Sequence, residues 1–181
     1  MIISNNYAQP QFKAGFKTSN IQQNRTRWNN IGKIFSEATK DSPDDNLVLG
    51  YTKSSKHPEM YLTLGSADNK IDRQYVANLG DWFLTKSNEE IADNLVKVYN
   101  GMKIKSEALK EYDKLQDKVY TEDVSAEMKA IRNNYAQDIL NQYGDNKEML
   151  KIFGAWHFDN YGPRGIADRL KYDYTARFIS D

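Results

Sequence analysis

Side chains able to do chemistry are most concentrated between residues 156 and 164, in the run Trp-His-Phe-Asp-Asn-Tyr-Gly-Pro-Arg. His157 has the side chain of a general base near neutral pH, and Asp159 is close enough in sequence to orient the imidazole. Arg164 follows a proline at the expected start of a helix, where a guanidinium and backbone amides together hold anions. The catalytic candidates are therefore His157 and Asp159. The candidate binding residues are Trp156, Tyr161 and Arg164.

A structural interpretation of the same run is favoured over a catalytic one. Trp156 and Phe158 would then anchor the core, while the imidazole and the carboxylate faced solvent. The chain contains no G-x-S-x-G elbow, no Walker-type loop and no H-E-x-x-H pair. With no cysteine and only two histidines, it excludes disulfides, thiolate zinc sites, iron–sulfur clusters and a histidine-rich metal site. We therefore expect no resident metal and no cofactor.

A second candidate site is basic and lies at the start of the chain. Residues 1–36 contain five cationic side chains and no acidic one. Candidates for phosphate contacts in a nucleic acid are Lys13, Lys17, Arg25 and Arg27. Against this, Lys+Arg and Asp+Glu both number 25, whereas nucleic-acid binders are usually strongly basic. Solvated cations on a strand and a helix start are the simpler interpretation, so nucleic acid is a disfavoured partner.

The clearest structural pattern is a helical periodicity in the middle of the chain. Apolar side chains recur every three or four residues from Ile91 to Val119, as on one face of a helix. Lys105 and Gln116 interrupt this stripe. Gly101 costs a helix about 1 kcal/mol relative to alanine, so a bend there, or two shorter helices, would fit nearly as well.

A second helix follows, with several plausible capping residues between 121 and 125 and a natural stop at Gly144. The short connection predicts an antiparallel helical hairpin over residues 87–144. We favour a pair of core helices over a dimerising coiled coil, because the stripe is short and interrupted. Two more helices are expected, over 145–154 and 166–178.

A small sheet is expected before this hairpin. Residues 11–18, 46–52 and 59–65 alternate apolar and polar side chains, which is typical of half-buried strands. Residues 24–40 have helical spacing and would cover the apolar face of the sheet. The β-α-β-β order predicts an antiparallel sheet of about three strands, and residues 71–79 would add a short helix.

These elements predict an α+β protein that is mostly helical. At 181 residues, one domain over 1–181 is the default. Within it, 1–9 would be loose, 10–86 would contain the sheet and 87–181 would be helical.

Composition and missing motifs favour a non-enzymatic protein that binds another protein or a second copy of itself. Its 12 tyrosines provide side chains that make good contact surface. One alternative is an enzyme or small-ligand-binding protein that uses the 156–164 loop, and another is nucleic-acid binding through the basic N-terminal segment. The chain has neither a signal-peptide pattern nor an apolar run long enough to span a membrane, so we expect a cytoplasmic location.

Overall fold

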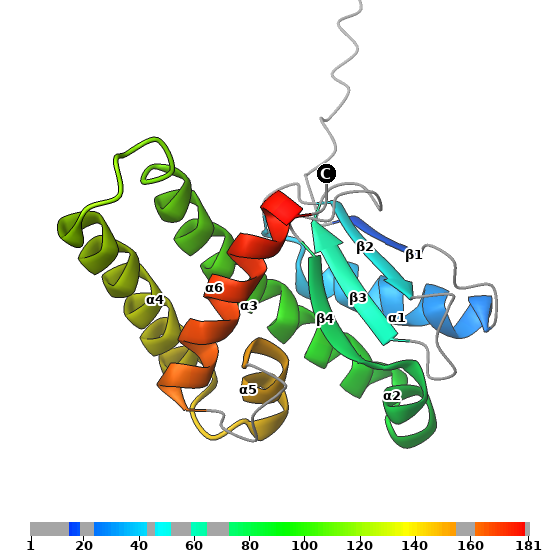
Figure 1. Ribbon diagram of the computed structural model, residues 1–181. Coiled ribbons are helices and arrows are strands. Elements are labelled where there is room, and N and C mark those ends of the chain that lie inside the picture. Colours follow the sequence, from blue (N-terminus) through cyan, green and yellow to red (C-terminus); the bar gives the residue numbers. More distant parts are fainter. Residues whose placement is uncertain are drawn as a thin grey trace, which may run out of the picture.

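The computed structural model combines a sheet with a larger set of helices (Figure 1). Six helices and four strands lie within the part of the chain that it describes. As expected from the sequence, this part is mostly helical. The described residues are 15–18, 24–42, 46–51, 59–64, 73–154 and 162–179.

The sheet has the strand order β1-β2-β3-β4. Strand β1 (Gly15–Thr18) pairs in parallel with β2 (Asn46–Tyr51), whereas β3 (Glu59–Leu64) and β4 (Arg73–Asn78) continue in antiparallel pairing. Helix α1 (Arg25–Ala38) connects the two parallel strands. Such a crossover is what parallel neighbours require, because a tight turn would reverse the chain direction.

The prediction of an antiparallel sheet of about three strands is wrong in two respects. The first pair of strands is parallel, and β4 occupies residues for which a helix over 71–79 was expected. In β4, Gln74 and Val76 are both buried, which is the two-residue period of a strand face. Pairing with β3, in which Leu62 lies opposite Gln74, decides the conformation of this segment. The apolar spacing could not reveal that long-range pairing.

Two helices lie side by side behind the sheet in Figure 1, α1 and α3 (Asn88–Asp113). Helix α1 buries the aromatic ring of Phe35, which meets Tyr99 of α3 edge to face with 6.2 Å between ring centroids. Helix α2 (Leu79–Thr85) leads from β4 into α3. One continuous cluster of buried apolar residues joins these helices to the sheet and to the C-terminal helices.

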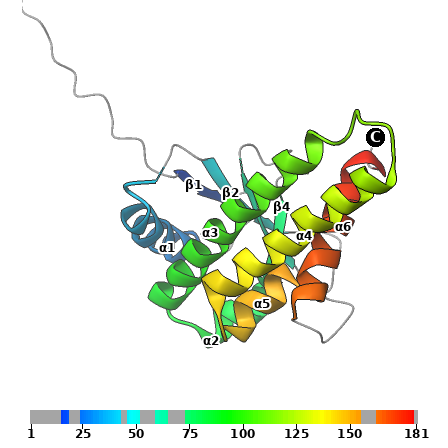
Figure 2. The same cartoon turned by 90° about the vertical axis from the view of Figure 1, so that its left-hand side faces the viewer.

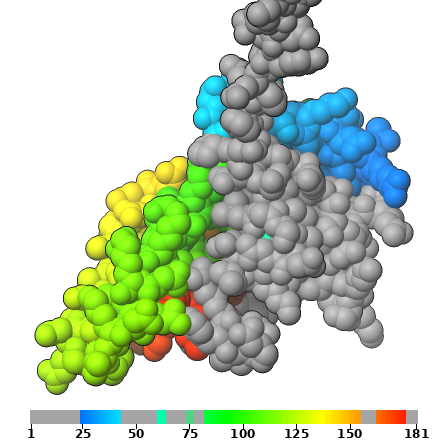
Figure 3. Space-filling view, turned by 90° about the horizontal axis from the view of Figure 1, so that it is seen from above, coloured from blue at the N-terminus to red at the C-terminus, as the bar shows by residue number. Residues whose placement is uncertain are grey.

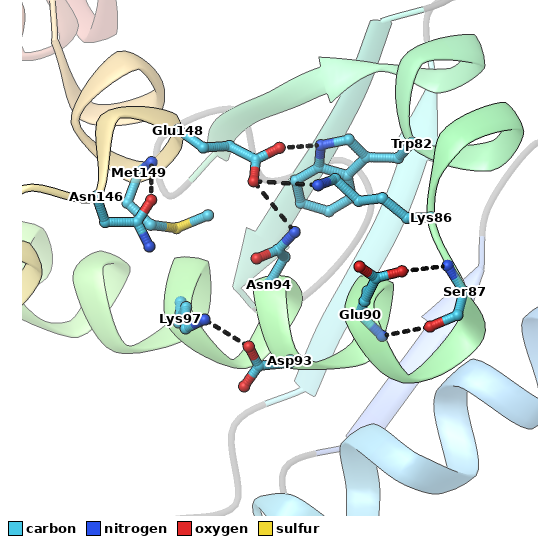
Figure 4. A network of polar contacts seen from close by, with 10 residues as sticks. All are labelled: Trp82, Lys86, Ser87, Glu90, Asp93, Asn94, Lys97, Asn146, Glu148 and Met149. Carbon is cyan, nitrogen blue, oxygen red and sulfur yellow. Dashed lines mark hydrogen bonds and ion pairs between the residues drawn. The ribbon is translucent and has the colours of Figure 1, made fainter.

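The start of α3 is fixed by a capping box, in which Ser87 and Glu90 bond each other's backbone N–H groups (Figure 4). The Ser87 backbone N–H, followed by its hydroxyl, lowers the pKa of the Glu90 carboxyl. Close by, Glu148 accepts hydrogen bonds from Trp82 Nε1 at 3.0 Å and Asn94 Nδ2 at 3.4 Å. Lys86 Nζ lies 3.3 Å from the same carboxylate. These contacts join α5 (Lys147–Phe153) to α2 and α3.

Helix α3 is continuous through Gly101, so the alternative of two shorter helices is wrong. The glycine instead allows a close approach of neighbouring helices. Phe153 of α5 and Tyr143 of α4 (Glu122–Tyr143) stack with their rings 5.6 Å apart, directly over Gly101. The Tyr143 hydroxyl donates a hydrogen bond of 2.5 Å to the Lys97 carbonyl oxygen.

The antiparallel hairpin predicted over 87–144 is confirmed as the pair α3 and α4. Gly144 ends α4 with a positive φ of 51°, a conformation that glycine adopts without steric cost. Helix α6 (Pro163–Ile179) packs along α4 (Figure 2). The far end of the hairpin projects away from the sheet in both views.

We expect Gly101→Ala to destabilise the protein, although alanine favours helices by about 1 kcal/mol. An added Cβ would lie 2.2 Å from Phe153 Cζ and 2.6 Å from the Tyr143 hydroxyl oxygen. Overpacking of this kind costs about 1–3 kcal/mol, measurable by urea unfolding. In a Phe153→Ala background the same change should cost less, because the two nearest of these contacts are then removed while the Tyr143 hydroxyl remains. A more stable single variant would contradict the close contact.

Candidate functional site

The catalytic prediction falls on the loop between α5 and α6. The members of this prediction that lie outside the described residues are Trp156, His157, Asp159 and Tyr161. Arg164 is described, and its side chain is 89% exposed, with Nε 3.8 Å from Asp168 Oδ2 one turn further along α6. An exposed pair at this distance contributes little to stability. The use of this loop as a catalytic or binding site stays a prediction.

The cationic candidates near the N-terminus occupy different environments. Lys13 lies outside the described residues, and for Lys17 the structure describes only the backbone, in β1. Arg25 is exposed at the start of α1, whereas Arg27 is partly buried. Nucleic-acid binding through these four side chains likewise stays a prediction.

Arg27 holds α1 against the junction of α2 and α3. Its two terminal nitrogens donate hydrogen bonds of 2.6 Å to the carbonyl oxygens of Phe83 and Lys86. Its Nε donates one of 2.8 Å to Asn88 Oδ1, and the guanidinium lies 4.3 Å from the centre of the Phe83 ring. A phosphate contact by Arg27 would have to compete with all of these interactions.

A group of polar and charged side chains is buried where α3, α6 and β4 meet. Lys105 of α3 is only 6% exposed, and its Nζ donates to Gln74 Oε1 at 3.0 Å and to Asp173 Oδ2. Arg169 Nε donates to the other oxygen of Asp173 at 2.9 Å. Gln74 Nε2 in turn donates to the Ile152 carbonyl oxygen at 2.9 Å. Lys105, which interrupts the apolar stripe in the sequence, is thus buried in an ion pair with Asp173.

Three tyrosines on α3 and α4 have hydroxyl groups whose pKa is raised. Burial raises the pKa of Tyr112, Tyr135 and Tyr143 above the ordinary value, because an apolar interior disfavours the phenolate. For Tyr135 the negative charge of Asp173 raises the pKa further. All three are therefore neutral near pH 7, as structural hydroxyls of the core.

The tip of the α3–α4 hairpin, residues 114–121, differs from the buried regions because it displays apolar side chains to solvent. Val119 is 83% exposed and Tyr120 is 75% exposed. Figure 3 shows this end of the hairpin standing out from the rest of the molecule. Among the described residues, the other large apolar side chains with high exposure are Leu84 and Tyr172. In the part of the chain whose exposure is described, only the tip places two such side chains next to each other in sequence.

The backbone of the hairpin tip is held in place by hydrogen bonds and one apolar anchor. Leu115 is buried, and its N–H donates to the Tyr112 carbonyl oxygen at 2.9 Å. On the other side, the Thr121 hydroxyl caps α4 by accepting the Val124 N–H at 3.3 Å. The Tyr120 hydroxyl donates to Ser125 Oγ at 3.4 Å. The two exposed side chains are therefore presented from a backbone with defined contacts.

Sequence reasoning placed Val119 on the buried stripe, and that assignment is wrong. Helix α3 ends at Asp113, residues 114–117 form turns and residues 119–121 have no regular secondary structure, so helical periodicity no longer applies at position 119. The signal that could have corrected it is Thr121 followed by Glu122 and an aspartate, which is typical of a helix start.

Comparison with known protein families, curated proteins and solved structures found no match to this chain. Within its described residues, no cluster of three or more His, Cys, Asp or Glu side chains is arranged to hold a metal ion. None of the helices described is long and apolar enough to cross a membrane.

The buried ion pair predicts unequal costs for its two partners. Asp173→Asn removes the carboxylate that both Lys105 and Arg169 bond, and breaking a buried pair in this way costs about 3–5 kcal/mol. Lys105→Met should cost less, because Asp173 keeps Arg169 as a partner at 2.9 Å. Urea unfolding of the two variants measures the difference, and an equal or smaller loss for Asp173→Asn would contradict this ordering.

The buried tyrosines predict a loss of stability at alkaline pH. A raised pKa in the folded state means that stability is intact below the unfolded value of about 10 and falls as the pH rises towards the folded value. Between the unfolded and the folded pKa, each such tyrosine lowers the free energy of unfolding by about 1.4 kcal/mol per pH unit. Tyr135→Phe should flatten this dependence in urea unfolding, whereas Tyr120→Phe, at an exposed position, should not.

Proposed function

We propose that this chain is an interaction protein that contacts a partner protein through the tip of its α3–α4 hairpin. The observation that supports the proposal is the exposed, adjacent pair Val119 and Tyr120. Exposed apolar surface on a soluble protein marks an interaction site more often as its contiguous area grows. Tyrosine is also enriched among the residues that dominate binding energy at interfaces.

The position of the pair on the molecule favours the same function. The tip stands clear of the sheet in two perpendicular views, so a partner can approach it from several sides (Figures 1 and 2). Its base is stiffened by the Tyr112 hydroxyl, which donates to the Met128 carbonyl oxygen across the hairpin at 3.1 Å. Below that contact, α6 packs along α4. A backbone segment held on such an arm loses little conformational freedom on binding, which favours affinity.

The proposal predicts that the double substitution Val119→Ser and Tyr120→Ser weakens partner binding at least about tenfold, since hot-spot residues contribute about 2 kcal/mol or more. Folding should be unaffected within about 0.5 kcal/mol, because both side chains are exposed. Immobilised protein would be used to capture partners from an extract of its source cells, with quantification by mass spectrometry. Light scattering after size exclusion would detect a second copy as the partner.

The matched control is Leu84→Ser, which removes an equally exposed apolar side chain on α2, away from the hairpin tip (Figure 1). The control should bind like the wild-type protein. The proposal fails if the protein is a monomer that retains no partner at micromolar concentration. It also fails if the tip variant and the control retain the same partners equally.

A further inference from the structure

Some charged side chains around the hairpin tip form ion pairs, and others do not. Lys114 Nζ lies 2.5 Å from Glu111 Oε1, and Lys118 Nζ lies 3.0 Å from Glu127 Oε2. These lysines are therefore already neutralised by carboxylates of their own hairpin. Three other carboxylates, in the tip or in the first turn of α4, have no cationic nitrogen within 4.0 Å in the described part of the chain. They are Asp117, Glu122 and Asp123.

Helix stabilisation accounts for only part of this acidic group. Glu122 and Asp123 lie in the first turn of α4, where carboxylates interact favourably with the helix dipole. Asp117 lies between the two helices, outside the first turn of α4, so the dipole gives no reason for its charge. The capping hydrogen bond is already supplied by the Thr121 hydroxyl. The three carboxylates thus flank Val119 and Tyr120 in sequence, and none of them is paired with a cation in the described part of the chain.

We infer that the partner bound at the hairpin tip is a basic protein segment, with lysine or arginine side chains beside an apolar residue or pocket. This inference rests on the proposed function. The apolar part of the partner covers Val119 and Tyr120, and its cations face Asp117, Glu122 and Asp123. Complementary charges at the rim of an interface speed association and reject partners of the wrong sign. Nucleic acid is rejected at this surface, because its phosphates carry the same charge as the tip.

The inference can be tested with a display library of random 12-residue peptides, selected on the immobilised full-length protein. Counter-selection on the variant Val119→Ser with Tyr120→Ser removes peptides that bind elsewhere. We expect the enriched peptides to combine a net positive charge with apolar side chains. Their affinity should fall about tenfold in the triple variant Asp117→Asn, Glu122→Gln and Asp123→Asn, and it should fall as salt is raised.

A second triple variant provides the charge-matched control. It carries Glu89→Gln in α3, Asp138→Asn in α4 and Asp145→Asn between α4 and α5, which remove three exposed carboxylates outside the tip. Peptide affinity should be unchanged in this control. Thermal unfolding of both triple variants verifies that each is folded.

The outcomes separate this inference from the proposed function. If peptides are enriched that require Val119 and Tyr120 but are uncharged or acidic, the basic partner is wrong and the binding tip stands. The same conclusion follows if the two triple variants bind equally well. If no enriched peptide depends on Val119 and Tyr120, both the inference and the proposed function are overturned.

Discussion

The close approach of three helices at Gly101 is the contact on which the rest of the helical part depends. Because Gly101 has no side chain, the rings of Tyr143 and Phe153 can lie directly against α3. That contact sets how near α4 and α5 lie to α3. Since α6 packs along α4, it also sets where α6 meets α3. The pairing of Lys105 with Asp173 is possible only because these helices are so close.

Local sequence signals located five of the six described helices, but they missed α2 and did not predict how the strands pair. The capping residues Ser87, Thr121 and Asn146 bond the first turns of α3, α4 and α5, so those helix starts are encoded within a few residues. Strand β4 was missed because its conformation is fixed by pairing with β3, which the local spacing does not report. The parallel pairing of Gly15 with Asn46 depends equally on a contact between distant segments.

The candidate surface was harder to predict than the fold. Val119 keeps the spacing of the apolar stripe, but this spacing gives no sign that helix α3 has already ended at Asp113. Exposure also depends on what the neighbouring elements cover, and no local pattern contains that information. Lys105 is the converse case. It is a charged residue on an apolar stripe, and it is buried because it pairs with Asp173, which is distant in sequence. The loop carrying His157 and Asp159 lies outside the described residues.

The parallel pairing of β1 with β2 also has an entropic consequence for the order of assembly. Pairing Gly15 with Asn46 closes a longer stretch of chain than pairing Leu47 with Leu64 in the neighbouring antiparallel strands. The entropy lost on closing a loop grows with the logarithm of its length. In addition, β1 has only 4 residues whose pairing can offset that loss of entropy. We therefore expect the antiparallel strands to associate first. We expect β1 to join the sheet later, after α1, which connects β1 to β2, has formed.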